Sequence, residues 1–266
     1  MELYIKVMTY LFAFIIGACI GSAALCFFDR RKRGEPWTKG HSHCTACGHE
    51  LKTKDLIPVF SYLSLHGKCR YCHTPYPMAT FLSEVSSGLA FMFAAGSVQR
   101  GLAAGNALMG GLEAVLFVML ALAAANDICC HECEYVLQFG ILAVGIAIAL
   151  LFGSAIRLLI GGWVCVMLIL VDFLYRKFAK RTENAIGFAD IIVFTGVTCA
   201  LPPLAAPLML FCSCVFSILS VPLAKKNQKM QKTEEDAEGV GMIPFILFGM
   251  FAASTIYRMY LVTLFI

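Results

Sequence analysis

Long apolar stretches alternate with short polar breaks along most of the chain, and charged residues are rare inside the apolar stretches. Each stretch approaches the length of about 20 residues that a helix needs to cross a bilayer. The pattern therefore predicts an all-α integral membrane protein with about eight transmembrane helices. The expected spans are residues 7–28, 80–98, 107–126, 136–153, 155–175, 186–201, 204–224 and 240–262.

Composition supports the same class of protein. Hydrophobic residues make up 59% of the chain, charged residues 14%, and the mean hydropathy is +0.78. These values exclude an ordinary cytosolic or secreted enzyme. We divide the chain into a first anchor at residues 1–28, a polar loop at 29–79 and a seven-helix membrane domain at 80–266. The first span is interpreted as a retained anchor because its basic flank follows the apolar run, unlike that of a signal peptide.

The basic residues are distributed unevenly about the expected spans. Seventeen of the 21 Lys and Arg residues fall in 29–79, 176–181 and 225–232, which an eight-span arrangement places on one side of the membrane. The positive-inside rule assigns that side to the cytoplasm, so both termini are expected outside. We expect the lipid bilayer as a partner and no nucleic acid.

Two Cys-x-x-Cys pairs, separated by 21 residues, lie in the polar loop. This spacing is typical of a structural zinc site, and a reducing cytoplasm argues against disulfides instead. Four thiolates leave no open coordination position, so we expect the Zn²⁺ to be structural and His43 and His49 to lie outside its coordination sphere. The predicted metal ligands are Cys44, Cys47, Cys69 and Cys72.

Two aspartates occupy matching positions at span ends. Asp127 closes the third expected span and Asp190 opens the sixth, so both are expected at the cytoplasmic edge of the bilayer. Two carboxyls that meet in a partly desolvated site share one proton, as in aspartic proteases. One then activates water while the other protonates the developing oxyanion. The alternative, in which both are independent helix caps, stays open.

Other acids in the apolar segments favour structural interpretations. Asp172 is expected to pair with Arg176 one helical turn away. Glu113 has no obvious partner and is expected to make a hydrogen bond between helices, while Glu84 reads as an interfacial residue. Because intramembrane acids also mark ion routes, a transporter or ion pathway remains an alternative function.

A second cluster of potential metal ligands follows Asp127. It lacks two clean Cys-x-x-Cys pairs, so we interpret it as reduced thiols in a turn. The cluster consists of Cys129, Cys130, His131 and Cys133.

Taken together, these motifs resemble the type IV prepilin peptidase family of GxGD-class membrane aspartic peptidases. The resemblance rests on Gly21-Ser22, His43 to Cys47, Asp55 to Ser61, Leu65 to Cys72, Pro75, Glu84, Asp127, Gly187 with Asp190, and Ile243-Pro-Phe245. It implies that Asp127 and Asp190 are catalytic. It also implies cleavage of the basic leader from type IV prepilin or pseudopilin precursors at the cytoplasmic face of the bacterial inner membrane. Many members also methylate the new N-terminus with S-adenosylmethionine.

The chain departs from the family pattern at several positions, among them Glu134-Tyr135, which replaces the usual proline and acid or amide after Asp127. Ala189 replaces the second glycine of GxGD, which removes easy access to positive φ and adds a methyl group beside the carboxyl. Ile192 replaces a frequent lysine. Leu25 replaces an asparagine in the first span, which weakens the case for methylation more than for proteolysis. A non-catalytic zinc-bearing scaffold is therefore a further alternative.

Overall fold

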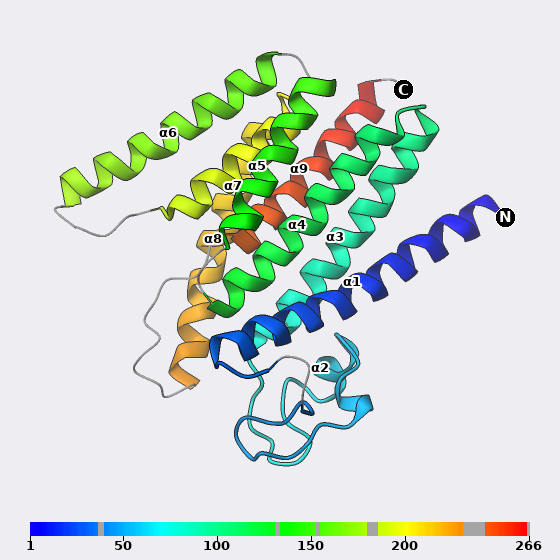
Figure 1. Cartoon of the computed structure of the whole chain (residues 1–266), viewed down its shortest axis with the longest axis vertical. Helices are drawn as coiled ribbons and strands as arrows, with labels where there is room; N and C mark the ends of the chain where they lie inside the picture. Colours follow the sequence, from blue (N-terminus) through cyan, green and yellow to red (C-terminus); the bar gives the residue numbers. More distant parts are fainter. Residues whose placement is uncertain (37–39, 131–133, 153–154, 180–185, 231–242, 265–266) are drawn as a thin grey trace.

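The computed structural model describes residues 1–36, 40–130, 134–152, 155–179, 186–230 and 243–264. Within these residues it contains nine α-helices, one short 3-10 helix and no strands beyond two isolated bridges (Figure 1). The α-helices are α1 (Glu2–Lys32), α2 (Phe60–Ser64), α3 (Met78–Ala103), α4 (Ala107–Cys130), α5 (Tyr135–Phe152), α6 (Ala155–Ala179), α7 (Phe188–Ala200), α8 (Ala205–Met230) and α9 (Ile243–Leu264).

The predicted all-α membrane fold is confirmed. Six of the described helices, α1, α3, α4, α5, α6 and α9, are long and apolar enough to cross a membrane. The sixth and seventh expected spans correspond to shorter apolar helices, α7 and the first part of α8. Helix α1 is longer than predicted, because it starts at Glu2 and continues through the basic residues to Lys32.

The centre of the bundle lies where α4 meets α3 and α9. Leu116 and Leu120 of α4 are fully buried there. Phe251 of α9 stacks on Phe93 of α3 at 4.7 Å between ring centroids and on Phe117 of α4 at 5.9 Å. These aromatic contacts bring together helices that are far apart in the sequence.

Small residues allow the helices to approach closely. A side chain at Gly21 of α1 would collide with Ser87 of α3, and one at Gly145 of α5 would collide with the backbone of Gly196 in α7. Since lipid supplies no hydrophobic force between helices, close van der Waals packing of this kind is a main source of their association.

Gly145→Ala is expected to destabilise the bundle, because the added methyl group would lie 1.9 Å from the Gly196 carbonyl oxygen. Separating two packed helices in this way costs about 1–3 kcal/mol of unfolding free energy. Thermal unfolding in detergent measures the effect. Gly162→Ala in α6 is the matched control, because nothing lies within 4 Å of its added methyl group. Equal melting temperatures for the two variants would contradict the interpretation.

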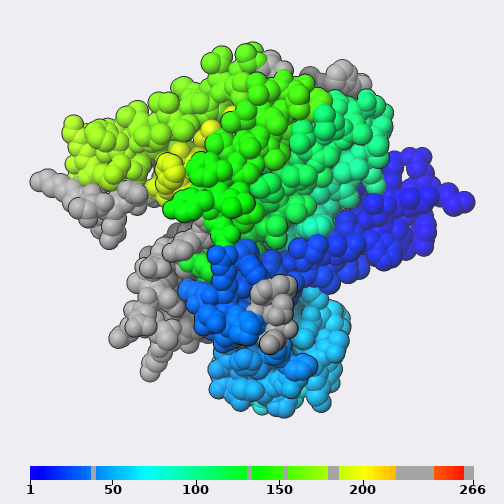
Figure 2. Space-filling view, viewed as in Figure 1, coloured from blue at the N-terminus to red at the C-terminus, as the bar shows by residue number. Residues whose placement is uncertain are grey.

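The polar loop forms a lobe beside the C-terminal end of α1 (Figure 2). We call residues 40–77 the cysteine lobe. It contains a 3-10 helix, Thr53–Asp55, and the five-residue α2. The chain leaves α1 for the lobe and re-enters the bundle at Met78, the first residue of α3. The lobe is therefore anchored to the bundle at both ends.

Candidate functional site

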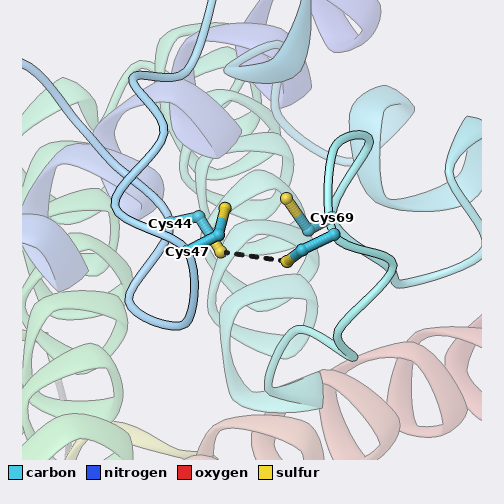
Figure 3. Close-up of side chains that lie close together, drawn as sticks. Cys44, Cys47 and Cys69 are labelled. Carbon is cyan, nitrogen blue, oxygen red and sulfur yellow. Dashed lines mark hydrogen bonds between the residues drawn. The ribbon is translucent and has the colours of Figure 1, made fainter.

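The four predicted metal ligands come together in the cysteine lobe. The sulfur atoms of Cys44, Cys47, Cys69 and Cys72 all lie within 4.8 Å of one another. Figure 3 shows these side chains converging from two loops, with three of them labelled and a dashed line for the 3.8 Å contact between Cys44 and Cys72. Cys44 is 3% exposed and Cys69 is 1% exposed. Among the described residues, no other group of His, Cys, Asp and Glu side chains gathers in this way.

The two Cys-x-x-Cys segments fold as similar tight turns. The Gly48 N–H donates to the Cys44 carbonyl at 2.8 Å, and the His73 N–H donates to the Cys69 carbonyl at 3.0 Å. Both donors have positive φ, 69° at Gly48 and 57° at His73. Such turns direct both thiols of a pair to one point, which is the arrangement of a tetrahedral metal site.

Two of the thiols, Cys72 and Cys47, differ in pKa. Hydrogen bonds from the Thr74 hydroxyl and N–H lower the pKa of Cys72 to about 6. The largest single influence on Cys47, a hydrogen bond from the His49 N–H, favours ionisation, but burial and the neighbouring thiols together raise its pKa to about 11. Because the thiolate is the metal-binding form, binding of a cation would favour ionisation of all four. The donor set therefore fits Zn²⁺.

A buried ion pair supports the lobe. Arg70 Nε donates to Asp55 Oδ1 at 2.6 Å, and the Asp55 side chain is almost fully buried. Burial alone would raise the pKa of Asp55, but the Arg70 guanidinium and the Lys52 N–H outweigh it, so the pKa is lowered. The Tyr71 hydroxyl lies 3.4 Å from Asp55 Oδ2, and the Tyr71 ring lies against the His49 ring, with 3.6 Å between the ring centroids and a tilt of 35°. These contacts connect the two turns that carry the cysteines.

Glu84 joins the lobe to the bundle. Its interpretation as a simple interfacial residue did not predict this contact. Glu84 is 5% exposed, and its Oε2 accepts a 2.6 Å hydrogen bond from the Val59 N–H. Val59 has a φ of 63°, an unfavourable conformation for a β-branched residue. The carboxylate thus supports a strained turn just before α2.

Glu84→Gln is expected to loosen the lobe, because a hydrogen bond to a charged group is worth about 1.5–3 kcal/mol. The variant should be cleaved faster by trypsin at Lys52 and Lys54, which belong to the lobe. Glu50→Gln is the control, because Glu50 is exposed and contacts only His41 among the ion pairs of the described residues. Equal cleavage rates in the two variants would refute the docking role of Glu84.

Asp127 lies in the last turn of α4 and is 6% exposed. The preceding residues, 123–125, are fully buried alanines that allow neighbouring helices to come close. The Ile243 N–H, at the start of α9, donates to Asp127 Oδ2 at 3.1 Å. The N-terminus of α9, with its unsatisfied N–H groups and positive dipole end, therefore faces this carboxylate.

Asp190 lies in the first turn of α7 and is half-buried. Its carboxylate turns back over Gly187, where a Cβ atom would lie 2.9 Å from Asp190 Oδ2. The two carboxylates are close enough for the charge of Asp127 to act on Asp190. The structure thus brings the two predicted catalytic acids into one region.

Ala189 does not disturb this region in the way its sequence suggested. It lies inside α7, and it is not among the described residues with positive φ. Ala189 therefore needs no positive φ in this structure, and the effect of its methyl group beside the carboxyl stays a prediction. Alanine is the residue best suited to a helix, so the substitution favours the first turn of α7.

The remaining acids have arginine partners. The pair of Asp172 with Arg176 is confirmed at 2.9 Å, and Asp172 Oδ1 also accepts from the Ile186 N–H at 3.4 Å, ahead of α7. Glu113 lies 3.5 Å from Arg100. This partner was not predicted from the sequence. Arg100 lies near the end of the preceding helix, and an antiparallel arrangement of two consecutive helices brings that end close to Glu113.

Of the second cysteine cluster, Cys129 and Cys130 belong to no group of potential metal ligands among the described residues. His131 and Cys133 lie outside the described residues. Two other departures from the family pattern are placed within helices: Leu25 is half-buried in α1 and Ile192 is buried in α7.

Residues 15–98 match the family model of the bacterial peptidase A24 N-terminal domain. This segment is therefore similar to the A24 N-terminal domain. The resemblance to prepilin peptidases is thereby confirmed for most of α1, the cysteine lobe and most of α3. Asp127 and Asp190 lie C-terminal to this matched segment, on α4 and α7.

Curated proteins that are similar to this segment are named prepilin leader peptidase/N-methyltransferase. The prepilin leader peptidase/N-methyltransferase of Myxococcus xanthus (strain DK1622) is 34% identical over 80 residues, which is 30% of this chain and 24% of that protein. The protein of the same name from Burkholderia pseudomallei (strain 1026b) is 40% identical over 82 residues, 30% of this chain and 26% of the relative. The chain therefore aligns with about a quarter of the length of these relatives. No solved structure matches the chain significantly.

Proposed function

We propose that the protein is a membrane aspartic endopeptidase that removes the basic leader from type IV prepilin or pseudopilin precursors. The observation that carries the proposal is the pair of acids, Asp127 and Asp190, gathered at helix ends in a chain with a segment similar to the A24 N-terminal domain. The names of the relatives support the substrate class.

In the proposed reaction the two acids share one proton. The ionised carboxylate takes a proton from water, which attacks the carbonyl carbon of the scissile peptide bond. The protonated carboxyl donates to the carbonyl oxygen as negative charge develops there. The Ile243 N–H orients the Asp127 carboxylate, and Asp172 holds the segment that leads to Asp190.

We propose that the cysteine lobe holds one structural Zn²⁺, because four thiolates suit that ion and leave no position for substrate. The lobe and the acids belong on the cytoplasmic side of the inner membrane, where the uneven distribution of Lys and Arg places residues 29–79. Methylation of the new N-terminus with S-adenosylmethionine is a second proposed activity, supported by the N-methyltransferase names of the relatives.

The ion-pathway alternative receives no support from the described acids. Of the two acids that would mark a route, Glu113 pairs with Arg100 of the neighbouring helix and Asp172 pairs with Arg176 of its own helix.

Coexpression with a type IV prepilin, followed by mass spectrometry of the precursor's N-terminus, tests both activities. The expected product lacks the basic leader, and an added methyl group would establish the transferase activity. A precursor that stays intact while a known prepilin peptidase cleaves it would contradict the proposed function.

A further inference from the structure

A cavity of about 520 Å³ lies between α1, α3 and α9. The depth of the cavity in the membrane follows from Arg100, one of its lining residues. Arg100 is about 33 Å along α3 from Met78, where the helix leaves the cysteine lobe. That distance is about the thickness of a hydrocarbon core, so the cavity lies near the opposite membrane face. The N-terminal end of α1, beside the cavity, extends beyond the other helices (Figures 1 and 2). The cavity lining includes Tyr10, Met92, Phe93, Arg100, Arg258 and Met259.

The charged groups of the cavity leave an excess of positive charge. Arg100 Nη2 lies 3.5 Å from Glu113 Oε2 and donates to Ser97 Oγ at 2.8 Å. The Arg258 guanidinium lies over the Phe93 ring at 5.8 Å from the ring centroid. It also interacts electrostatically with both Arg100 and Glu113. One carboxylate thus faces two guanidinium groups.

The polar groups gather at one edge of the cavity. A Cβ atom at Gly96 would lie 3.1 Å from Arg100 Nη1 and 3.3 Å from the Tyr10 hydroxyl, so both groups stand over this glycine. Met92, Phe93 and Met259 form an apolar part of the lining, and the hydroxyl of Thr255, which also lines the cavity, donates to the Phe251 carbonyl of its own helix. A cationic, hydrogen-bonding edge therefore adjoins an apolar hollow.

We propose that this cavity binds an anionic phospholipid. Its phosphate would lie between Arg100 and Arg258, whose forked donors suit phosphate oxygens. An acyl chain would cover the apolar part of the lining. The charge balance favours an anion over a zwitterion, and an acyl chain distinguishes the lipid from free phosphate. The inference is independent of the proposed peptidase activity.

Native mass spectrometry of the purified full chain, in detergent supplemented with phosphatidylglycerol or phosphatidylethanolamine, tests the proposal. Phosphatidylglycerol should be retained preferentially. The double variant Arg100→Gln with Arg258→Gln should lower its retention about tenfold or more, because it removes both guanidinium groups that would hold the phosphate. Lys6→Gln is the matched control, because Lys6 is an exposed cation on α1 that pairs with Glu2.

Unchanged phosphatidylglycerol retention in the double variant would overturn the proposal, as would an equal loss in Lys6→Gln. If inorganic phosphate competes as strongly as phosphatidylglycerol, the site recognises phosphate without the acyl chain, and the lipid proposal is also overturned. If the double variant does not fold, phosphatidylglycerol retention is measured in the single variant Arg258→Gln, which leaves the pair of Arg100 and Glu113 in place. Loss of retention in that variant supports the lipid site, and full retention refutes it.

Discussion

Asp127→Asn and Asp190→Asn are each expected to abolish cleavage of a coexpressed prepilin. Asparagine keeps the size of the side chain and can still accept the hydrogen bond from the Ile243 N–H at position 127. It cannot share a proton or act as an acid or base at working pH, and such roles contribute about 10²- to 10⁴-fold to rate. The precursor should accumulate at full length on a gel.

Glu113→Gln is the control for these variants, because Glu113 pairs with Arg100 and lies far from Asp127 along α4. It should process the precursor at the normal rate. Zinc content and melting temperature should be the same in all three variants, which separates lost chemistry from lost folding. Normal processing by either aspartate variant would refute the assignment of that residue as catalytic.

Replacing Cys44 and Cys72 by serine is expected to remove the metal. Purified protein should contain about one zinc per chain by elemental analysis, and the double variant should contain none. Because a small lobe with few buried apolar residues depends on the metal for its folding free energy, trypsin should cut it rapidly in the variant. A chelator should produce the same sensitivity in the unmodified protein.

Cys19→Ser with Cys26→Ser is the matched control. Both residues are exposed on α1 and lie outside the group of potential ligands, so zinc content and trypsin resistance should not change. A Cys44 and Cys72 double variant that keeps its zinc would contradict the assigned ligands. Activity measured on the folded fraction then separates a structural metal from a catalytic one, because a structural metal changes the amount of active protein and not the rate per active molecule.

Local patterns made much of the fold predictable. Helix length and apolarity indicated the spans, because a bilayer imposes nearly the same requirement on every crossing segment. The Cys-x-x-Cys spacing indicated the cysteine group, and a separation of four residues indicated the pair of Asp172 and Arg176. In each case the partners are adjacent in the sequence or obey a fixed spacing.

Contacts between distant segments were not predictable in the same way. The hydrogen bond from Val59 to Glu84 joins residues 25 positions apart across an irregular loop, and no spacing rule governs it. The pair of Arg100 and Glu113 depends on the exact packing of two antiparallel helices. The conformation of Ala189 depended on where α7 begins, and helix boundaries are the least certain feature of a sequence pattern.

The contact between α9 and Asp127 is made by a main-chain group. Any residue except proline supplies an N–H at position 243, so side-chain replacements there leave the donor intact. An alanine scan of α9 would therefore overlook this interaction, and divergence at position 243 in evolution would not erase it. Only a change that moves the whole helix, or a proline at its first residue, can deprive the acid of this partner.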